Sequence, residues 1–169
     1  AGLARQRHFP AINWLSSYSL YPQSLNQWFR DNIASDFPEV RTQISALLKV
    51  EAELQEIVQL VGSDALPIDQ QLTLEVARMI REYFLQQNGF DPIDAYSGVQ
   101  QQYAMAQAIL TFQEEAKKAM AAGARLQDVV NVPARTELMR ARFAEGYLEK
   151  IGGLVEAMVV EIAATAEAN

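Results

Sequence analysis

Apolar side chains recur at helical spacing throughout this chain, in segments that glycine and proline separate, and this pattern most constrains the fold. The clearest stripe consists of Val40, Ile44, Leu47, Leu54, Ile57, Val58 and Val61, close to the period of about 3.6 residues of an amphipathic helix. Strict alternation of apolar and polar residues, which is typical of a half-buried strand, is almost absent. With 169 residues the chain is long enough to bury one core. We therefore expect an all-α bundle.

Breaker and capping residues divide the chain into helices. We expect these at about 22–34, 38–61, 68–87, 99–122 and 125–130, followed by a helical region from residue 133 onward. This last region must break once, either near Phe143–Gly146 or at Gly152-Gly153. Residues 1–21 are rich in aromatics without a helical period, so we expect an irregular segment there and a helical domain over 22–169. The chain does not begin with Met, which suggests a fragment of a longer protein.

Composition and charge exclude several kinds of function. The net charge of −7 argues against nucleic-acid binding, which needs clustered Lys and Arg. The chain has no cysteine, so it can form neither a disulfide framework nor a thiolate metal site. No apolar run approaches the roughly 18 residues that a membrane span needs, and we expect no direct membrane insertion.

Few residues are candidates for chemistry. His8 is the only histidine, and without cysteines or paired carboxylates nearby we expect a structural role rather than a metal site. No serine lies in a Gly-x-Ser-x-Gly elbow, and no Gly-x-x-x-x-Gly-Lys-Ser/Thr phosphate loop is present. We expect neither catalytic nor metal-binding residues. The acidic and basic residues of two predicted helices are interpreted as solvated faces; they are Glu51, Glu53, Glu56, Glu114, Glu115, Lys117 and Lys118.

Two phenylalanines lie beside backbone breakers, far apart in the sequence. Phe9 precedes Pro10, and Phe90 follows Gly89. Aromatic side chains on turns can clamp a flat ring between them. The alternative is that both are core residues, which is the usual location of phenylalanine.

Several longer strings resemble one protein family. They are residues 7–19 (RHFPAINWLSSYS), 51–62 (EAELQEIVQLVG), 72–78 (LTLEVAR), and Ile109-Leu110-Thr111-Phe112 with Glu114-Glu115-Ala116. Together they resemble the C-terminal part of the catalytic A subunit of V-type and archaeal-type rotary ATPases. The resemblance covers nearly the whole chain and is strongest over 5–21 and 47–96.

The resemblance implies a function for this segment. In that family each catalytic chain combines a nucleotide-binding domain, which carries the phosphate loop, with a C-terminal helical domain, and three A chains alternate with three B chains around a rotor shaft. Residues 1–21 correspond to the end of the nucleotide-binding domain. Phe9 and Phe90 fall on the family's adenine-pocket aromatics. The resemblance implies that the full-length protein binds ATP or ADP with magnesium. It also implies a peripheral complex on the cytoplasmic side of a membrane. The alternative is a free-standing helical interaction module.

The turn between the predicted helices 38–61 and 68–87 resembles the tip that faces the rotor shaft in the family. The implied contact residues are Asp64, Ala65, Leu66, Pro67, Ile68 and Asp69. Only two of these are acidic, so we expect contact with the shaft to depend on shape and apolar surface. Since an exposed turn adds little to a fold, we expect changing Leu66 and Ile68 to serine to leave thermal stability nearly unchanged.

Overall fold

The computed structural model describes residues 8–17 and 20–167, and within them all regular secondary structure is helical. This confirms the predicted all-α fold. The α-helices are α2 (Pro22–Asn32), α3 (Phe37–Val61), α4 (Ile68–Met79), α5 (Val99–Ala121), α6 (Leu126–Val130), α7 (Pro133–Ala141) and α8 (Tyr147–Glu167). Three short helices join them: the 3-10 turns η1 (Ser63–Ala65) and η3 (Asp94–Tyr96), and the π-helix η2 (Ile80–Leu85), which continues α4.

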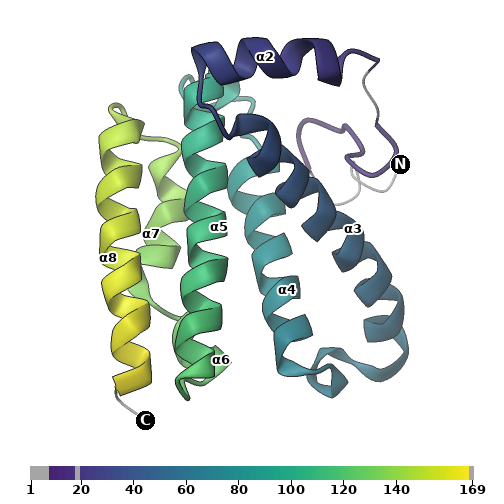
Figure 1. The fold of residues 1–169 in the computed structure, drawn as a ribbon, viewed down its shortest axis with the longest axis vertical. Coiled ribbons are helices and arrows are strands. Elements are labelled where there is room, and N and C mark those ends of the chain that lie inside the picture. Colours follow the sequence, from purple (N-terminus) through teal and green to yellow (C-terminus); the bar gives the residue numbers. More distant parts are fainter. Residues whose placement is uncertain (1–7, 18–19, 168–169) are drawn as a thin grey trace.

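Helix α5 lies at the centre of the bundle. Helix α8 packs on one side of it and carries α7, the α3–α4 hairpin packs on the other side, and α2 crosses one end (Figure 1). The connection from α4 to α5 and the connection from α7 to α8 meet at the end near α2. The tip of the α3–α4 hairpin lies at the opposite end (Figure 1).

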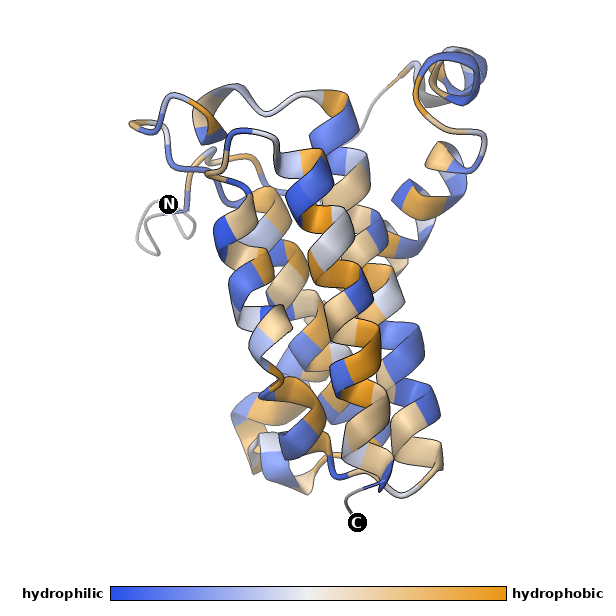
Figure 2. Ribbon diagram, turned by 90° about the vertical axis from the view of Figure 1, so that its left-hand side faces the viewer, coloured by the Kyte–Doolittle hydropathy of each residue, from blue (hydrophilic) through white to orange (hydrophobic). Residues whose placement is uncertain are grey.

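The core extends along the whole bundle. Its largest fully buried side chains are Phe112, Leu72, Met79, Ile80, Ile109, Leu138, Met158, Ile162, Val76 and Val129. Figure 2, viewed from the α8 side, shows apolar residues over the full length of the helices. Helices α4 and α5 supply half of this set. Burial of this kind contributes roughly 1.5–3 kcal/mol for each large apolar side chain.

The predicted stripe of α3 is correct in its first half and wrong in part of its second. Val40, Ile44 and Leu54 are buried, but Ile57 and Val61 are exposed, because α3 diverges from α5 toward the hairpin tip (Figure 1).

Glu51 lies on the buried face of α3, which corrects its interpretation as a solvated residue. Its side chain pairs with Arg81 of η2 at 3.0 Å, and only 5% of the residue is exposed. Burial raises the pKa of Glu51, and the nearby Arg81 charge opposes that shift. The charged face predicted on α5 is confirmed in part by the Lys118–Glu115 pair at 2.7 Å.

A second charged residue, Arg135 of α7, is buried inside the bundle. Its side chain donates to the carboxylate of Glu75 at 2.7 Å and to the carbonyl oxygen of Val130 at 2.6 Å. Its guanidinium carbon also lies 5.2 Å from the centre of the Phe112 ring. Arg135 therefore links α7, α6, α4 and α5 through one side chain.

The late helical region breaks at the first of the two predicted places. Helix α7 ends at Ala141, and α8 begins at Tyr147 after Gly146 adopts a φ of 69°. Gly152 and Gly153 continue within α8 as exposed residues. The left-handed conformation at Gly146 is costly for other residue types, which explains why the turn forms there.

Candidate functional site

Three segments that are distant in sequence form a cleft at the end of the bundle opposite the hairpin tip. They are the N-terminal segment, the loop after η2 and the connection between α7 and α8. The cleft has a volume of about 530 Å³ and is lined by Phe9, Gln86, Gln87, Asn88, Gly89, Phe90, Arg142 and Phe143. The structure therefore brings Phe9 and Phe90 together. Phe9 is 52% exposed and Phe90 fully exposed, so the alternative that both are core residues is wrong.

Phe9 is held against the loop by its backbone and by its ring. The amide of Gln87 donates to the carbonyl oxygen of Phe9 at 2.6 Å. A β-carbon added to Gly89 would lie 3.1 Å from Cε1 of the Phe9 ring, closer than ordinary packing allows. Glycine at position 89 thus permits the close approach of the ring to the loop.

Asp94 organises the loop that carries Phe90. This carboxylate is buried, with 2% of the residue exposed, and it accepts from the backbone amide of Asn88 at 2.5 Å. The carbonyl oxygen of Asp94 accepts from the side-chain amide of Gln87 at 2.9 Å. The side-chain oxygen of Asn88 in turn accepts from the backbone amide of Phe90 at 3.1 Å. Phe90 extends from a hydrogen-bonded loop, although its own ring is exposed.

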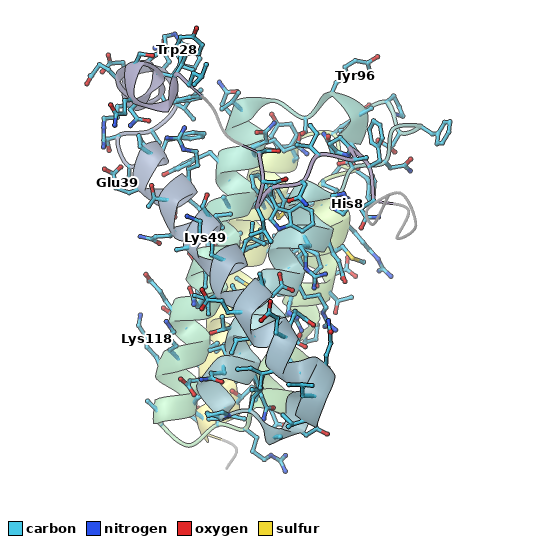
Figure 3. All side chains as sticks on the ribbon, turned by 90° about the vertical axis from the view of Figure 1, so that its right-hand side faces the viewer. His8, Trp28, Glu39, Lys49, Tyr96 and Lys118 are labelled. Atoms are coloured by element: carbon cyan, nitrogen blue, oxygen red, sulfur yellow. The ribbon has the colours of Figure 1, made fainter. Side chains whose placement is uncertain are left out.

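His8 lies beside this region, and its ring contacts neighbouring residues of the N-terminal segment. Its Nδ1 is 3.1 Å from the carbonyl oxygen of Pro10, and its ring centre is 5.2 Å from that of Trp14. Figure 3 places His8 and Tyr96 toward the same end of the bundle. Across residues 8–17 and 20–167 there is no cluster of three or more His, Cys, Asp or Glu side chains suited to a metal ion.

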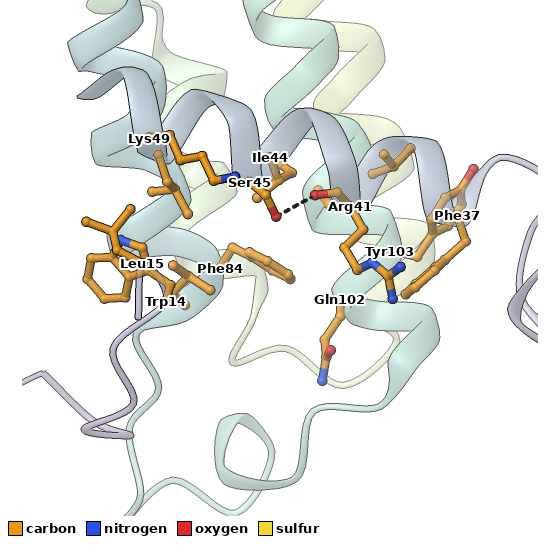
Figure 4. Close-up of a pocket in the computed structure, with 14 residues that line it drawn as sticks. Trp14, Leu15, Phe37, Arg41, Ile44, Ser45, Lys49, Phe84, Gln102 and Tyr103 are labelled. Atoms are coloured by element: carbon orange, nitrogen blue, oxygen red, sulfur yellow. Dashed lines mark hydrogen bonds between the residues drawn. The ribbon is translucent and has the colours of Figure 1, made fainter. Parts of the chain in front are cut away.

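A second cavity, of about 240 Å³, lies between the N-terminal segment, α3, η2 and α5. Its walls are mostly apolar and include Trp14, Phe37, Phe84 and Tyr103, as Figure 4 shows. Burial of the Tyr103 hydroxyl, which donates to Asp36 at 2.6 Å, raises the pKa of Tyr103. Several of the lining residues are aromatic. They do not include the paired acid and base that general acid–base catalysis would use.

The hairpin tip is mostly exposed, with one exception. Asp64, Ala65, Pro67, Ile68 and Asp69 are exposed, whereas Leu66 is only 7% exposed. The carbonyl oxygen of Leu66 also accepts from the side-chain amide of Gln71 at 2.8 Å. The expectation that Leu66 is a free surface residue without effect on the fold is therefore wrong, because its side chain is buried at the tip.

Sequence reasoning missed most of the cleft wall, including the whole contribution of the connection between α7 and α8. Arg142 and Phe143 line the cleft together with Phe9 and Phe90, yet neither was singled out. The available signal was an aromatic residue at a predicted helix break, the same signal that drew attention to Phe90.

In the part of the chain that the structure describes, no helix combines the length and apolar character needed to cross a bilayer.

Comparison with known proteins identifies the family. Residues 26–130 match the family model described as the C-terminal domain of V and A type ATP synthase. The chain belongs to this family. Helices α3, α4 and α5 all fall within the matched residues, so the hairpin and the central helix of the bundle are part of the family's domain.

Individual relatives extend the match beyond the family model. The chain is 48% identical to the A subunit of the A-type ATP synthase of Methanosarcina barkeri over 96% of its own length, and 47% identical to that of Haloquadratum walsbyi over 96%. It is 44% identical to the A-type ATP synthase A subunit 1 of Methanospirillum hungatei over 99%. It spans only 28–29% of the length of these relatives. No observation favours the alternative of a free-standing interaction module.

Proposed function

We propose that this chain is the part of an ATP synthase A subunit that holds the adenine base of ATP or ADP and contacts the rotor. One observation carries the first half of the proposal: Phe9 and Phe90, 81 positions apart in sequence, line one open cleft. Aromatic faces accept any flat base. Glutamine supplies the donor and acceptor pair that the edge of adenine needs, and Gln86 is part of the cleft wall.

The cleft holds the base but leaves phosphoryl chemistry to other residues. Phosphoryl transfer depends on positioning and on neutralising phosphate charge, and this sequence has no phosphate loop. Magnesium and the phosphates would therefore bind outside the chain. We expect the purified chain to release no phosphate from ATP. A phosphate-release assay that shows turnover above that of a boiled control would contradict this assignment.

Adenosine is the direct probe of the cleft. Stacking contributes roughly 1–3 kcal/mol for each base–aromatic contact, so two contacts predict a Kd of roughly millimolar order. Saturation-transfer NMR detects binding in this range. We expect Phe9→Ala and Phe90→Ala each to weaken adenosine binding at least about fivefold. Tyr96→Ala, which changes an exposed aromatic outside the cleft lining, should leave it unchanged.

The same substitutions should have a distinct kinetic effect in the full-length protein. Stacking on adenine, remote from the terminal phosphate, contributes about equally to the ground state and the transition state. Such uniform binding changes KM rather than kcat. A large fall in kcat with an unchanged KM would assign Phe9 and Phe90 another role.

The second half of the proposal concerns the hairpin tip and its partners. We assign Asp64, Ala65, Leu66, Pro67, Ile68 and Asp69 to the rotor-shaft contact, with B subunits as the neighbours in a peripheral complex on the cytoplasmic side of the membrane. Helix α4 and η2 form one continuous element from this tip to the loop of Phe90. This continuity supports a mechanical link between the two ends.

Cysteine cross-linking tests the tip assignment, because the chain has no cysteine of its own. We expect Asp64→Cys to form a disulfide with cysteines placed along the shaft of the assembled complex. Lys118→Cys, on an exposed part of α5 outside the tip, is the control. If no tip position forms a cross-link in any nucleotide state, the rotor contact is wrong.

A further inference from the structure

The cleft has a third wall that the pair Phe9 and Phe90 does not explain. Arg142 and Phe143 follow directly after α7 and line the same cleft. The guanidinium carbon of Arg142 lies 4.7 Å from the centre of the Phe143 ring. A cation in this position covers one face of the aromatic ring, so a ligand can reach only the opposite face or the edge of Phe143.

Arg142 also forms hydrogen bonds with the segment that leads to Phe90. Its Nη1 donates to the carbonyl oxygen of Glu82 at 2.6 Å and to that of Gln86 at 2.7 Å. Carbonyl groups at the end of a helix have no partner within the helix, and Arg142 supplies one from a different part of the chain. Hydrogen bonds from a charged donor are stronger than those between neutral groups.

The same side chain approaches the buried carboxylate of the loop. Nε of Arg142 lies 3.6 Å from Oδ2 of Asp94, and the two side chains are only 13% and 3% exposed. This is the oxygen that accepts from the amide of Asn88, two residues before Phe90. A buried carboxylate needs a compensating charge, and Arg142 is the cation placed beside it.

We infer that Phe143 is a third base-contacting residue of this cleft and that Arg142 is the positioning residue that fixes both Phe143 and the Phe90 loop. The inference rests on the proposed function of the cleft. It adds a contribution from the α7–α8 connection to a site otherwise made by the N-terminal segment and the loop after η2. The predicted ligand is the adenine moiety, and the added residues affect how tightly it is held.

The experiment uses the purified chain with adenosine as the probe and compares two arginines of one helix region. Arg142→Gln removes the positioning side chain, while Arg140→Gln removes an equal charge that is exposed and paired with Glu137 within α7. Hydrogen exchange of the Asn88 amide reports the loop directly. We expect Arg142→Gln to speed that exchange at least about tenfold and to weaken adenosine binding at least about threefold. Arg140→Gln should change neither.

Two substitutions at position 143 separate contact from positioning. Phe143→Leu removes the aromatic face but keeps an apolar side chain, so adenosine binding should weaken at least about threefold while Asn88 exchange stays unchanged. Phe143→Tyr keeps the ring and should retain most of the affinity. If Arg142→Gln unfolds the chain, Arg142→Lys keeps the charge but loses the paired donors, and faster Asn88 exchange in that variant supports the positioning role.

The outcomes distinguish this inference from the proposed function. If the native chain binds adenosine and Phe9→Ala weakens binding, but Phe143→Leu and Arg142→Gln behave like Arg140→Gln, the inference is wrong and the proposed function stands. If the native chain does not bind adenosine, both are wrong as regards the ligand. Unchanged Asn88 exchange in Arg142→Gln overturns the positioning role in either case.

Discussion

Arg135→Ala should unfold the bundle at a much lower temperature than the native chain. Arg135 is 4% exposed and is the buried partner of Glu75. Removing one partner of a buried ion pair typically costs about 3–5 kcal/mol. Glu75 keeps its pair with Arg78 at 2.9 Å, so the loss would come mainly from the carbonyl oxygen of Val130 left without its donor and from the lost packing on the Phe112 ring. For a domain of this size, each kcal/mol lowers Tm by roughly 2–4 °C. We therefore expect Tm to fall by about 6–20 °C in a calorimetric or circular-dichroism melt.

Arg140 provides the matched control for this substitution. It lies on the same helix and pairs with Glu137, but its side chain is 64% exposed. Exposed pairs contribute at most about 1 kcal/mol, so Arg140→Ala should change Tm little. Arg135→Met should recover part of the loss, because a long apolar side chain can still cover the Phe112 ring. Equal Tm values for Arg135→Ala and Arg140→Ala would show that the buried pair is not important for stability.

Leu66→Ser should be the second strongly destabilising change, although it lies at the proposed rotor tip. Removing a buried leucine side chain typically costs about 2–5 kcal/mol, and a buried serine hydroxyl adds to that cost. The free energy of unfolding can be measured with urea, and we expect it to fall by at least about 2 kcal/mol.

Ile68→Ser provides the comparison on the same turn. Ile68 is 52% exposed, so its replacement should cost less than about 1 kcal/mol. A smaller loss for Leu66→Ser than for Ile68→Ser would mean that Leu66 does not pack as the structure shows. The comparison also guides work on the assembled complex, where Ile68 and Asp64 report on the rotor contact without unfolding the hairpin.

The helices were predictable because their determinants are local. Apolar spacing indicated the buried face of α3 over its first half, and Gly62 and Gly123 follow α3 and α5 with positive φ angles that other residues rarely adopt. The pairing of Phe9 with Phe90 followed from the family resemblance rather than from periodicity. The position of each beside a backbone breaker was a weaker local signal for an exposed aromatic.

The misplacement of Glu51 and the omission of Arg142 share a physical cause: both side chains depend on partners that are distant in sequence. Glu51 is charged, and only the approach of Arg81 from another helix makes its burial acceptable. Leu66 looks like part of an exposed turn, yet only 7% of it is exposed in the folded chain. Arg142 bonds to carbonyl groups 60 and 56 residues away, so no local pattern could assign it to the cleft.

The position of the Phe90 loop depends on the number of residues in the π-helix η2, which directly precedes it. At its end the amide of Gln86 donates to the carbonyl oxygen of Arg81, five residues earlier, at 2.8 Å. A π turn contains one residue more than the α-helical turn it replaces. If the same residues wound as a regular α-helix, everything that follows would be rotated by about 100° around the helix axis. The π winding thus sets the direction in which Phe90 leaves the bundle, and an insertion in this segment should alter the cleft more than most substitutions.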